Sequence, residues 1–132
     1  MEPVSLKIFV DDIRSAPEGW VRAKTITEAV RMLHEFNVSE ISLDHDIAYL
    51  DEGGRFVGKC HDENFTAVAR FIALLPEAER PGRVFIHTSN PAGAFALEGI
   101  LKGHVKELVR DTTFAHQWGE DPLLRKGLHE PG

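Results

Sequence analysis

Residues 42–47 read SLDHDI, and this stretch decides the fold because an apolar run stops there at consecutive ionisable side chains. The residues EISL (40–43) end that run and predict a β-strand. Asp44, His45 and Asp46 follow it at once. Carboxylates repel one another and resist removal from water. The triplet therefore requires either a compensating partner or contact with solvent.

The same pattern occurs at the end of two other strand-like segments, SLKIFV (5–10) and RVFIHT (83–88). The polar residues at these ends are Asp11 and Asp12 in the first case, and His87, Thr88, Ser89 and Asn90 in the second. In a parallel sheet the carboxyl ends of neighbouring strands lie at one edge, where ligands bind. We therefore expect these polar groups to gather at that edge.

Strand-like and helix-like segments alternate along the chain. Thr25 and Glu28 form a capping-box pattern at the start of one helix, and Asn90 followed by proline predicts the start of another. A small hairpin is expected around DEGG (51–54). The expected helices span 25–37, 64–75 and 90–103, and two further strands are expected at 20–23 and within 104–111.

This order of elements predicts an α/β fold of the flavodoxin-like type. Its parallel sheet would be doubly wound, with five strands in the order 2-1-3-4-5 and helices on both faces. The length of 132 residues suits a single domain. We expect a core over about residues 5–111 and an irregular tail over 112–132, in which Phe114 and Trp118 either pack on the domain or do not.

The composition disfavours several classes of function. The formal net charge of -6 argues against a broad face for duplex nucleic acid. No apolar stretch approaches the roughly 20 residues of a membrane-spanning helix, and no signal peptide is recognised. Cys60 is the single cysteine, so no disulfide can form within the chain. These features together indicate a cytoplasmic protein.

The carboxylates expected at the sheet edge predict a metal site. Its candidate ligands are Asp11, Asp12, Asp44 and Asp46. Carboxylate oxygens suit hard ions such as Mg²⁺, Mn²⁺ and Ca²⁺, and Mg²⁺ or Mn²⁺ is the expected cofactor. Participation of histidine would extend the choice to iron and Zn²⁺.

An anion site is expected beside the metal site. Asn90 opens a helix whose first backbone N–H groups can bind an anion, and the hydroxyl groups of Thr88 and Ser89 add donors. Arg14 is either a phosphate clamp or an ordinary surface charge. A cation site beside an anion site suits a phosphoryl group.

Three motifs carry a family resemblance: FVDD (9–12), SLDHD (42–46) and IHTSNP (86–91). They resemble the receiver domains of two-component response regulators, and in particular a divergent branch described as cyclic-phosphate-processing receiver-like domains. The resemblance covers about residues 5–111. It implies a receiver-like fold and the processing of cyclic phosphates, such as 2′,3′-cyclic ends or cyclic nucleotides.

The resemblance also implies roles for individual residues. Asp11 and Asp12 match the acidic pair that holds Mg²⁺ in receivers. Asp44 matches the aspartate that holds the metal and accepts the phosphoryl group. Thr88 or Ser89 matches the hydroxyl residue that contacts that group.

The chain departs from ordinary receivers in two respects. Receivers carry a lysine after the last strand, and here that cation is missing unless Arg110 replaces it. His45, Asp46 and His87 are not receiver residues, but they fit the divergent branch.

The first hypothesis is an enzyme, a metal-assisted phosphoesterase that acts on a cyclic phosphate or a related phosphoester. Its partner would be a small phosphorylated substrate or a nucleic-acid end that carries a cyclic phosphate. His87 and His45 are expected to face one another across the phosphoryl group, and His87 is ranked first as the proton donor or acceptor. Either water or Asp44 attacks phosphorus.

Two alternatives remain open. The chain is either a non-catalytic pseudo-receiver module that binds a phosphorylated ligand or accepts phosphate on Asp44, or an α/β interaction domain with a structural cation. The missing lysine counts against an ordinary phosphorylation switch, whereas the two histidines favour chemistry.

Overall fold

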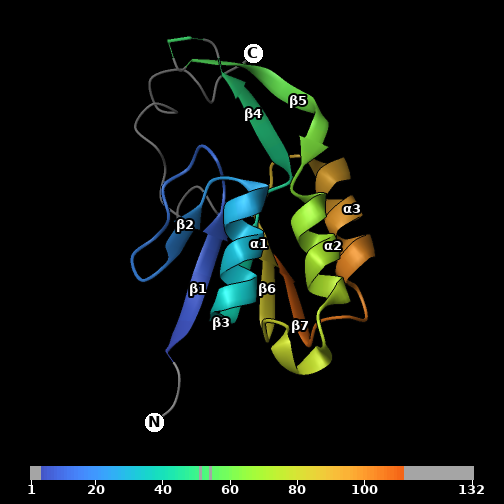
Figure 1. Cartoon of the computed structure of the whole chain (residues 1–132). Helices are drawn as coiled ribbons and strands as arrows, with labels where there is room; N and C mark the ends of the chain where they lie inside the picture. The colour runs from blue at the N-terminus through green and yellow to red at the C-terminus, as the bar shows by residue number, and fades with distance from the viewer. Residues whose placement is uncertain (1–3, 51, 54, 112–132) are drawn as a thin grey trace.

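The computed structural model describes residues 4–50, 52–53 and 55–111, and its centre is a parallel sheet of five strands (Figure 1). These strands are β1 (Ser5–Val10), β2 (Val21–Ala23), β3 (Asn37–Leu43), β6 (Arg83–Ile86) and β7 (Glu107–Arg110). They lie in the order β2-β1-β3-β6-β7, and every pairing is parallel. The order is the predicted 2-1-3-4-5, because the strands of a hairpin take the two intervening numbers.

Among the α-helices of the described residues, the first and the third begin where the capping residues predict. The helices are α1 (Ile26–Glu35), α2 (Thr66–Leu74) and α3 (Pro91–Leu101), and a short 3₁₀ turn, η1 (Glu77–Glu79), follows α2. The hydroxyl of Thr25 accepts a hydrogen bond from the amide of Glu28 at 3.0 Å, and the side chain of Asn90 accepts one from the amide of Gly93 at 3.1 Å. Each cap satisfies an amide that has no partner within its own helix.

The winding of the sheet differs from the expectation of helices on both faces. The crossovers through α1, α2 and α3 all advance from β2 toward β7, and right-handed crossovers in one direction place their helices on one face. Accordingly α1 contacts α2, and α2 contacts α3. The β1–β2 connection runs the other way, and residues 11–20 contain no helix. Within the described residues the sheet is therefore wound on one side, and the doubly wound prediction is not confirmed.

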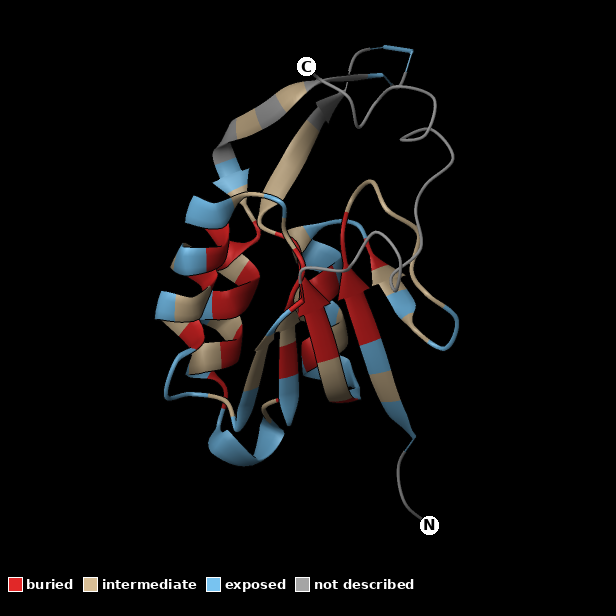
Figure 2. Ribbon diagram, turned by 180° about the vertical axis from the view of Figure 1, so that it is seen from behind, coloured by how far each residue is buried: buried red, intermediate tan, exposed pale blue. Residues whose placement is uncertain are grey.

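The main core lies between the sheet and the helices. Ile8, Ile41 and Val84 point from three neighbouring strands into one cluster with Val68 and Leu97 of the helices. Figure 2 shows from behind that strands such as β1 and β3 are buried toward their carboxyl ends and exposed toward their amino ends. The edge at which the polar residues are expected to gather is therefore the well-packed one.

The opposite face of the sheet carries a row of alternating charges at its exposed end. Lys7, Glu40, Arg83 and Glu107 are register partners across four adjacent strands. The ammonium of Lys7 lies 3.6 Å from Glu40, and Arg83 contacts both glutamates. Opposite charges on neighbouring strands support this register, although half-exposed ion pairs contribute little each.

The predicted hairpin is confirmed and is larger than expected. Its strands, β4 (Asp46–Leu50) and β5 (Phe56–Asn64), form a separate antiparallel sheet beyond the carboxyl ends of the main strands (Figure 1). The hairpin is tied to the domain because the amide of Phe65 donates to the carbonyl of His45 at 2.8 Å. It therefore stands beside the edge where the polar residues gather.

The predicted tail over 112–132, with Phe114 and Trp118, lies outside the described residues. Among the helices that are described, none has both the length and the apolar character that a membrane crossing requires.

Candidate functional site

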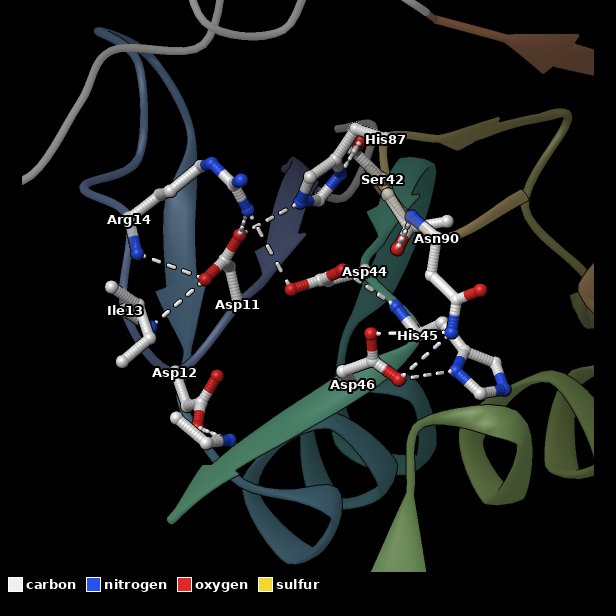
Figure 3. A network of polar contacts seen from close by, with 12 residues as sticks. Asp11, Asp12, Ile13, Arg14, Ser42, Asp44, His45, Asp46, His87 and Asn90 are labelled. Carbon is white, nitrogen blue, oxygen red and sulfur yellow. Dashed lines mark hydrogen bonds and ion pairs between the residues drawn. The ribbon is translucent and has the colours of Figure 1, made fainter. Parts of the chain in front are cut away.

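Asp11, Asp44 and His87 each follow the last residue of a main strand, and the parallel hydrogen-bond ladder continues through them. The amide of Asp44 donates to the carbonyl of Val10 at 3.0 Å, and the amide of His87 donates to the carbonyl of Leu43 at 2.9 Å. The ladder fixes the three backbones side by side. Figure 3 shows their side chains gathered at this edge, as the sequence predicted.

Asp11 is fully buried and is the most heavily bonded group of the site. Its Oδ1 accepts hydrogen bonds from the amides of Ile13 and Arg14, each at 2.8 Å. Its Oδ2 lies 3.0 Å from Nη1 of Arg14 and 3.0 Å from Nε2 of His87. Burial opposes ionisation, but these partners outweigh it and lower the pKa of Asp11. Asp11 is therefore a fixed carboxylate near neutral pH.

His87 is also fully buried, and both of its ring nitrogens have partners. Nε2 of the ring contacts Asp11, and Nδ1 lies 2.6 Å from the hydroxyl of Ser42. The ring also stacks on Phe9 with centroids 4.3 Å apart. Burial lowers the pKa of His87 despite the nearby carboxylate, so we assign a neutral ring. Because ionised Asp11 can only accept, Nε2–H must donate to it and the Ser42 hydroxyl must donate to Nδ1.

Asp44 has a different environment. Its Oδ1 accepts from the amide of His45 at 2.7 Å, and its Oδ2 lies 3.7 Å from Nη1 of Arg14. Burial and the charge of Asp11 raise the pKa of Asp44 well above its ordinary value, against the influence of Arg14 and of a hydrogen bond with Thr88. The folded protein thus strongly disfavours a second negative charge here.

Asp12 contributes the third carboxylate. Its Oδ2 accepts from the amide of Ala48 in β4 at 2.7 Å, whereas its Oδ1 is buried without a hydrogen-bond partner. Burial raises the pKa of Asp12, and the charge of Asp11 adds to this effect. A buried carboxylate oxygen without a donor is rare in folded proteins.

One ligand atom each from Asp11, Asp12 and Asp44 lies within 4.8 Å of the others. Three carboxylates at this spacing suit a hard divalent cation, and the unpartnered Oδ1 of Asp12 is the atom that such an ion would satisfy. The residues therefore fit the predicted metal. Asp46, the fourth candidate, is not in this group.

Asp46 instead joins His45 to the start of α3. Its Oδ1 lies 2.8 Å from Nδ1 of His45, and the side-chain amide of Asn90 donates to both carboxylate oxygens at 3.3 Å. The ring of His45 rests against Gly93, where an added Cβ would lie 2.4 Å from its Cγ. Figure 3 shows this ring on the far side of Asp46 from the other carboxylates.

The two histidines do not face one another as the sequence analysis expected. His45 lies against α3, whereas His87 is enclosed by Phe9, Asp11 and Ser42. Period-2 alternation explains the separation, because His45 and Asp44 leave opposite faces of the chain as β3 ends.

The candidate phosphate-binding residues are placed unevenly. The hydroxyl of Thr88 accepts from the amide of Asn90 at 3.2 Å, close to Asp44, and Ser89 is exposed. Arg14 lies among the carboxylates. Arg110 does not replace the missing receiver lysine, because its Nη1 pairs with Glu98 of α3 at 2.7 Å.

Sequence reasoning overlooked two supporting residues, Ser42 and Gly93. Ser42 is a fully buried polar residue two positions before Asp44 and on the same strand face. The position of Ser42 between two apolar residues of the strand could have indicated that its side chain lies on the same face as Asp44. No sequence pattern predicts that the ring of His45 lies against Gly93.

Comparison with protein families finds a match that covers most of the chain. The model of a family described as the cyclic-phosphate processing receiver domain matches residues 6–103. That span runs from β1 past the end of α3 and contains every residue of the site. Comparison with curated proteins and with solved structures finds no match.

Proposed function

The chain belongs to the cyclic-phosphate-processing receiver family, and on that premise we propose that it is a metal-dependent phosphoesterase. Its substrate would be a cyclic phosphate or a related phosphoester, carried by a small molecule or by a nucleic-acid end. The observation that carries the proposal is the carboxylate cluster with the unpartnered Oδ1 of Asp12. Such a cluster is unfavourable unless a cation completes it.

Asp11, Asp12 and Asp44 would hold the ion, with Mg²⁺ or Mn²⁺ preferred because all ligands are oxygens. When bound, the ion would polarise a phosphoryl oxygen or activate a water molecule. Asp46 has no place in this set, because it lies outside the group of three carboxylates and its oxygens contact His45 and Asn90 instead. We therefore remove it from the metal ligands.

Proton transfer falls to the pair of His45 and Asp46. Asp46 holds Nδ1 of the ring, which leaves Nε2 as the atom that exchanges a proton. His87, ranked first from the sequence, is fully buried with both nitrogens engaged. In this proposal His87 is a positioning residue that orients Asp11.

The phosphoryl oxygens would meet three kinds of donor. The hydroxyl of Thr88 lies beside Asp44. In the first turn of α3 the amide of Ala92 is left for an anion, because Pro91 has no N–H and the amide of Gly93 donates to Asn90. Arg14 supplies the guanidinium. Both routes of attack, by water or by Asp44, stay open, because Asp44 lies within the cluster.

A pseudo-receiver module is the second candidate. It is favoured by the place of Asp44 after β3 and by its hydrogen bond with Thr88, which match the acceptor and hydroxyl of receivers. A stable adduct with beryllofluoride, without hydrolysis of any ester, would support the module over the enzyme.

The experiment is a screen of metals against substrates. Mg²⁺, Mn²⁺, Ca²⁺ and Zn²⁺ are each combined with 2′,3′-cyclic, 3′,5′-cyclic and linear phosphate esters. We expect turnover of a cyclic ester with Mg²⁺ or Mn²⁺, and its loss in Asp12→Asn. Absence of turnover for every combination with folded protein would refute the proposal.

A further inference from the structure

We propose that Arg14 occupies the cation position between Asp11 and Asp44 in the ion-free protein, and that it exchanges this position for a phosphate oxygen when a divalent ion binds. The proposal deepens the proposed function, since it concerns the same site and the same class of ligand. It predicts that binding of metal and binding of phosphate depend on each other through one side chain.

The first step is the geometry of a single nitrogen atom. Nη1 of Arg14 lies 3.0 Å from Oδ2 of Asp11 and 3.7 Å from Oδ2 of Asp44. These two residues supply ligand atoms of the group that could hold a metal. The guanidinium therefore already bridges two of the three carboxylates that a cation would bridge (Figure 3).

The second step is charge. One guanidinium brings a single positive charge to three carboxylates, whereas a divalent ion brings two. An arginine side chain stays protonated under all ordinary conditions, so it cannot become neutral to make room. Two cations that share the same carboxylate oxygens repel each other strongly in a buried site. Arg14 must therefore weaken or give up its contact with Asp44 when the ion binds.

The third step is the way Arg14 is attached. Its backbone amide donates to Oδ1 of Asp11 at 2.8 Å, and this bond does not involve the guanidinium. Asp11 also keeps its bonds from Ile13 and His87. The backbone is thus held in place while the side chain, which is 18% exposed, can turn toward solvent. A guanidinium released there matches the geometry of two phosphate oxygens.

Arg22 provides a matched control. Its Nε donates to the backbone carbonyl of Asp11 at 3.0 Å. Arg22 is thus a second arginine that contacts Asp11, but it binds the backbone carbonyl and not a carboxylate oxygen. Removal of Arg22 takes away a nearby charge without opening the Asp11–Asp44 bridge.

The test measures affinities and needs no turnover. Titration calorimetry gives the affinity for Mn²⁺ without phosphate, and for inorganic phosphate with Mn²⁺ present, in the wild type, Arg14→Gln and Arg22→Gln. We expect Arg14→Gln to bind Mn²⁺ about tenfold more tightly and phosphate about tenfold more weakly, the size of one charge-assisted hydrogen bond. Arg22→Gln should change both affinities by much less.

Equal or weaker Mn²⁺ binding by Arg14→Gln would overturn the proposal, because removal of a guanidinium that competes with Mn²⁺ for the carboxylates must strengthen Mn²⁺ binding. Tighter Mn²⁺ binding with unchanged phosphate binding would overturn the exchange, because the released side chain would then not serve phosphate. If Arg14→Gln does not fold, the wild type decides. Phosphate must tighten Mn²⁺ binding there, and its failure to do so refutes the exchange.

These outcomes are separate from those of the proposed function. If the affinities change as expected but the protein hydrolyses no ester, the Arg14 exchange is supported and the phosphoesterase function is refuted. If the protein hydrolyses a cyclic ester but Arg14→Gln binds Mn²⁺ no more tightly than the wild type, the phosphoesterase function is supported and the Arg14 exchange is refuted.

Discussion

Nε2 of His87 lies 3.0 Å from Oδ2 of Asp11, although the two residues are 76 positions apart in the chain. The hydroxyl of Ser42 holds the other side of the ring at 2.6 Å. A polar chain from Ser42 through His87 thus reaches a carboxylate that would hold the metal. Buried networks of this kind are costly unless every member is satisfied, and here all three residues have partners.

His87 should make stability depend on pH. Because burial lowers its pKa in the folded protein, the unfolded chain takes up a proton first as pH falls below about 6.5. Stability should therefore decrease on acidification through this window, by at most about 1.4 kcal/mol per pH unit. Urea unfolding at pH 7.5 and 5.5 measures the effect, and His87→Gln should lose this part of it. An unchanged pH dependence in His87→Gln would show that the ring has the same pKa in the folded and unfolded states, which would contradict the neutral, buried ring assigned here.

Asp12→Asn should stabilise the metal-free protein and abolish its response to metal. The substitution keeps an acceptor for the amide of Ala48 and removes a charge that burial disfavours. We expect a gain of about 1 kcal/mol without metal, the scale of one unsatisfied buried group. Thermal unfolding with and without Mn²⁺ measures both effects.

Asp46→Asn is the matched control for that experiment. It removes a carboxylate that lies outside the group of Asp11, Asp12 and Asp44. The stabilisation by Mn²⁺ should persist in this variant. If Asp46→Asn also abolishes it, Asp46 is a ligand after all and the assignment made here is wrong.

The stabilisation by metal should grow with pH. The raised pKa of Asp44 means that the folded protein binds more protons than the unfolded chain once pH exceeds about 3.8. Stability is then lost as pH rises toward the folded pKa, because Asp44 must ionise inside the fold. A cation removes this penalty, so the rise in Tm with Mn²⁺ should be larger at pH 7.5 than at pH 5. Equal rises at both values would mean that the ion does not replace a proton on Asp44.

The sequence was sufficient for the sheet and for the grouping of its polar ends. The segments that end at Asp11, Asp44 and His87 were recognisable as strands, and parallel pairing alone brings their ends together. The winding of helices on both faces is not confirmed within the described residues. Residues 14–19 were interpreted as a loop, and a loop between β1 and β2 leaves no helix for the second face within the described residues.

The site was less predictable, because side-chain direction decides it. The alternation of side chains along a strand indicated that His45 and Asp44 point in opposite directions. The start of β4 at Asp46 could not be predicted from the pattern of apolar and polar residues. The partner of His87 lies 45 residues away at Ser42, a separation at which sequence periodicity carries no information. Neighbouring residues in SLDHDI thus separate into a proposed metal ligand, a ring against α3 and the carboxylate that contacts this ring.

Gly93→Ala tests whether His45 needs its place against α3. The new Cβ would lie 2.4 Å from Cγ and 2.6 Å from Nδ1 of His45, so the ring or the helix must shift, which disturbs the contact of His45 with Asp46. We expect turnover of the cyclic ester to fall by about 10²-fold or more, the usual range for proton transfer. The rise in Tm with Mn²⁺ should stay, because the cluster of Asp11, Asp12 and Asp44 is untouched.

Gly99→Ala is the control, because Gly99 lies in the same helix and an added Cβ there meets no atom within 4 Å. That variant should keep full turnover and gain about 1 kcal/mol of stability from its higher helix propensity. The contrast between the two variants isolates the contact with His45 from any general effect of alanine in α3. Full activity in folded Gly93→Ala would remove His45 from proton transfer.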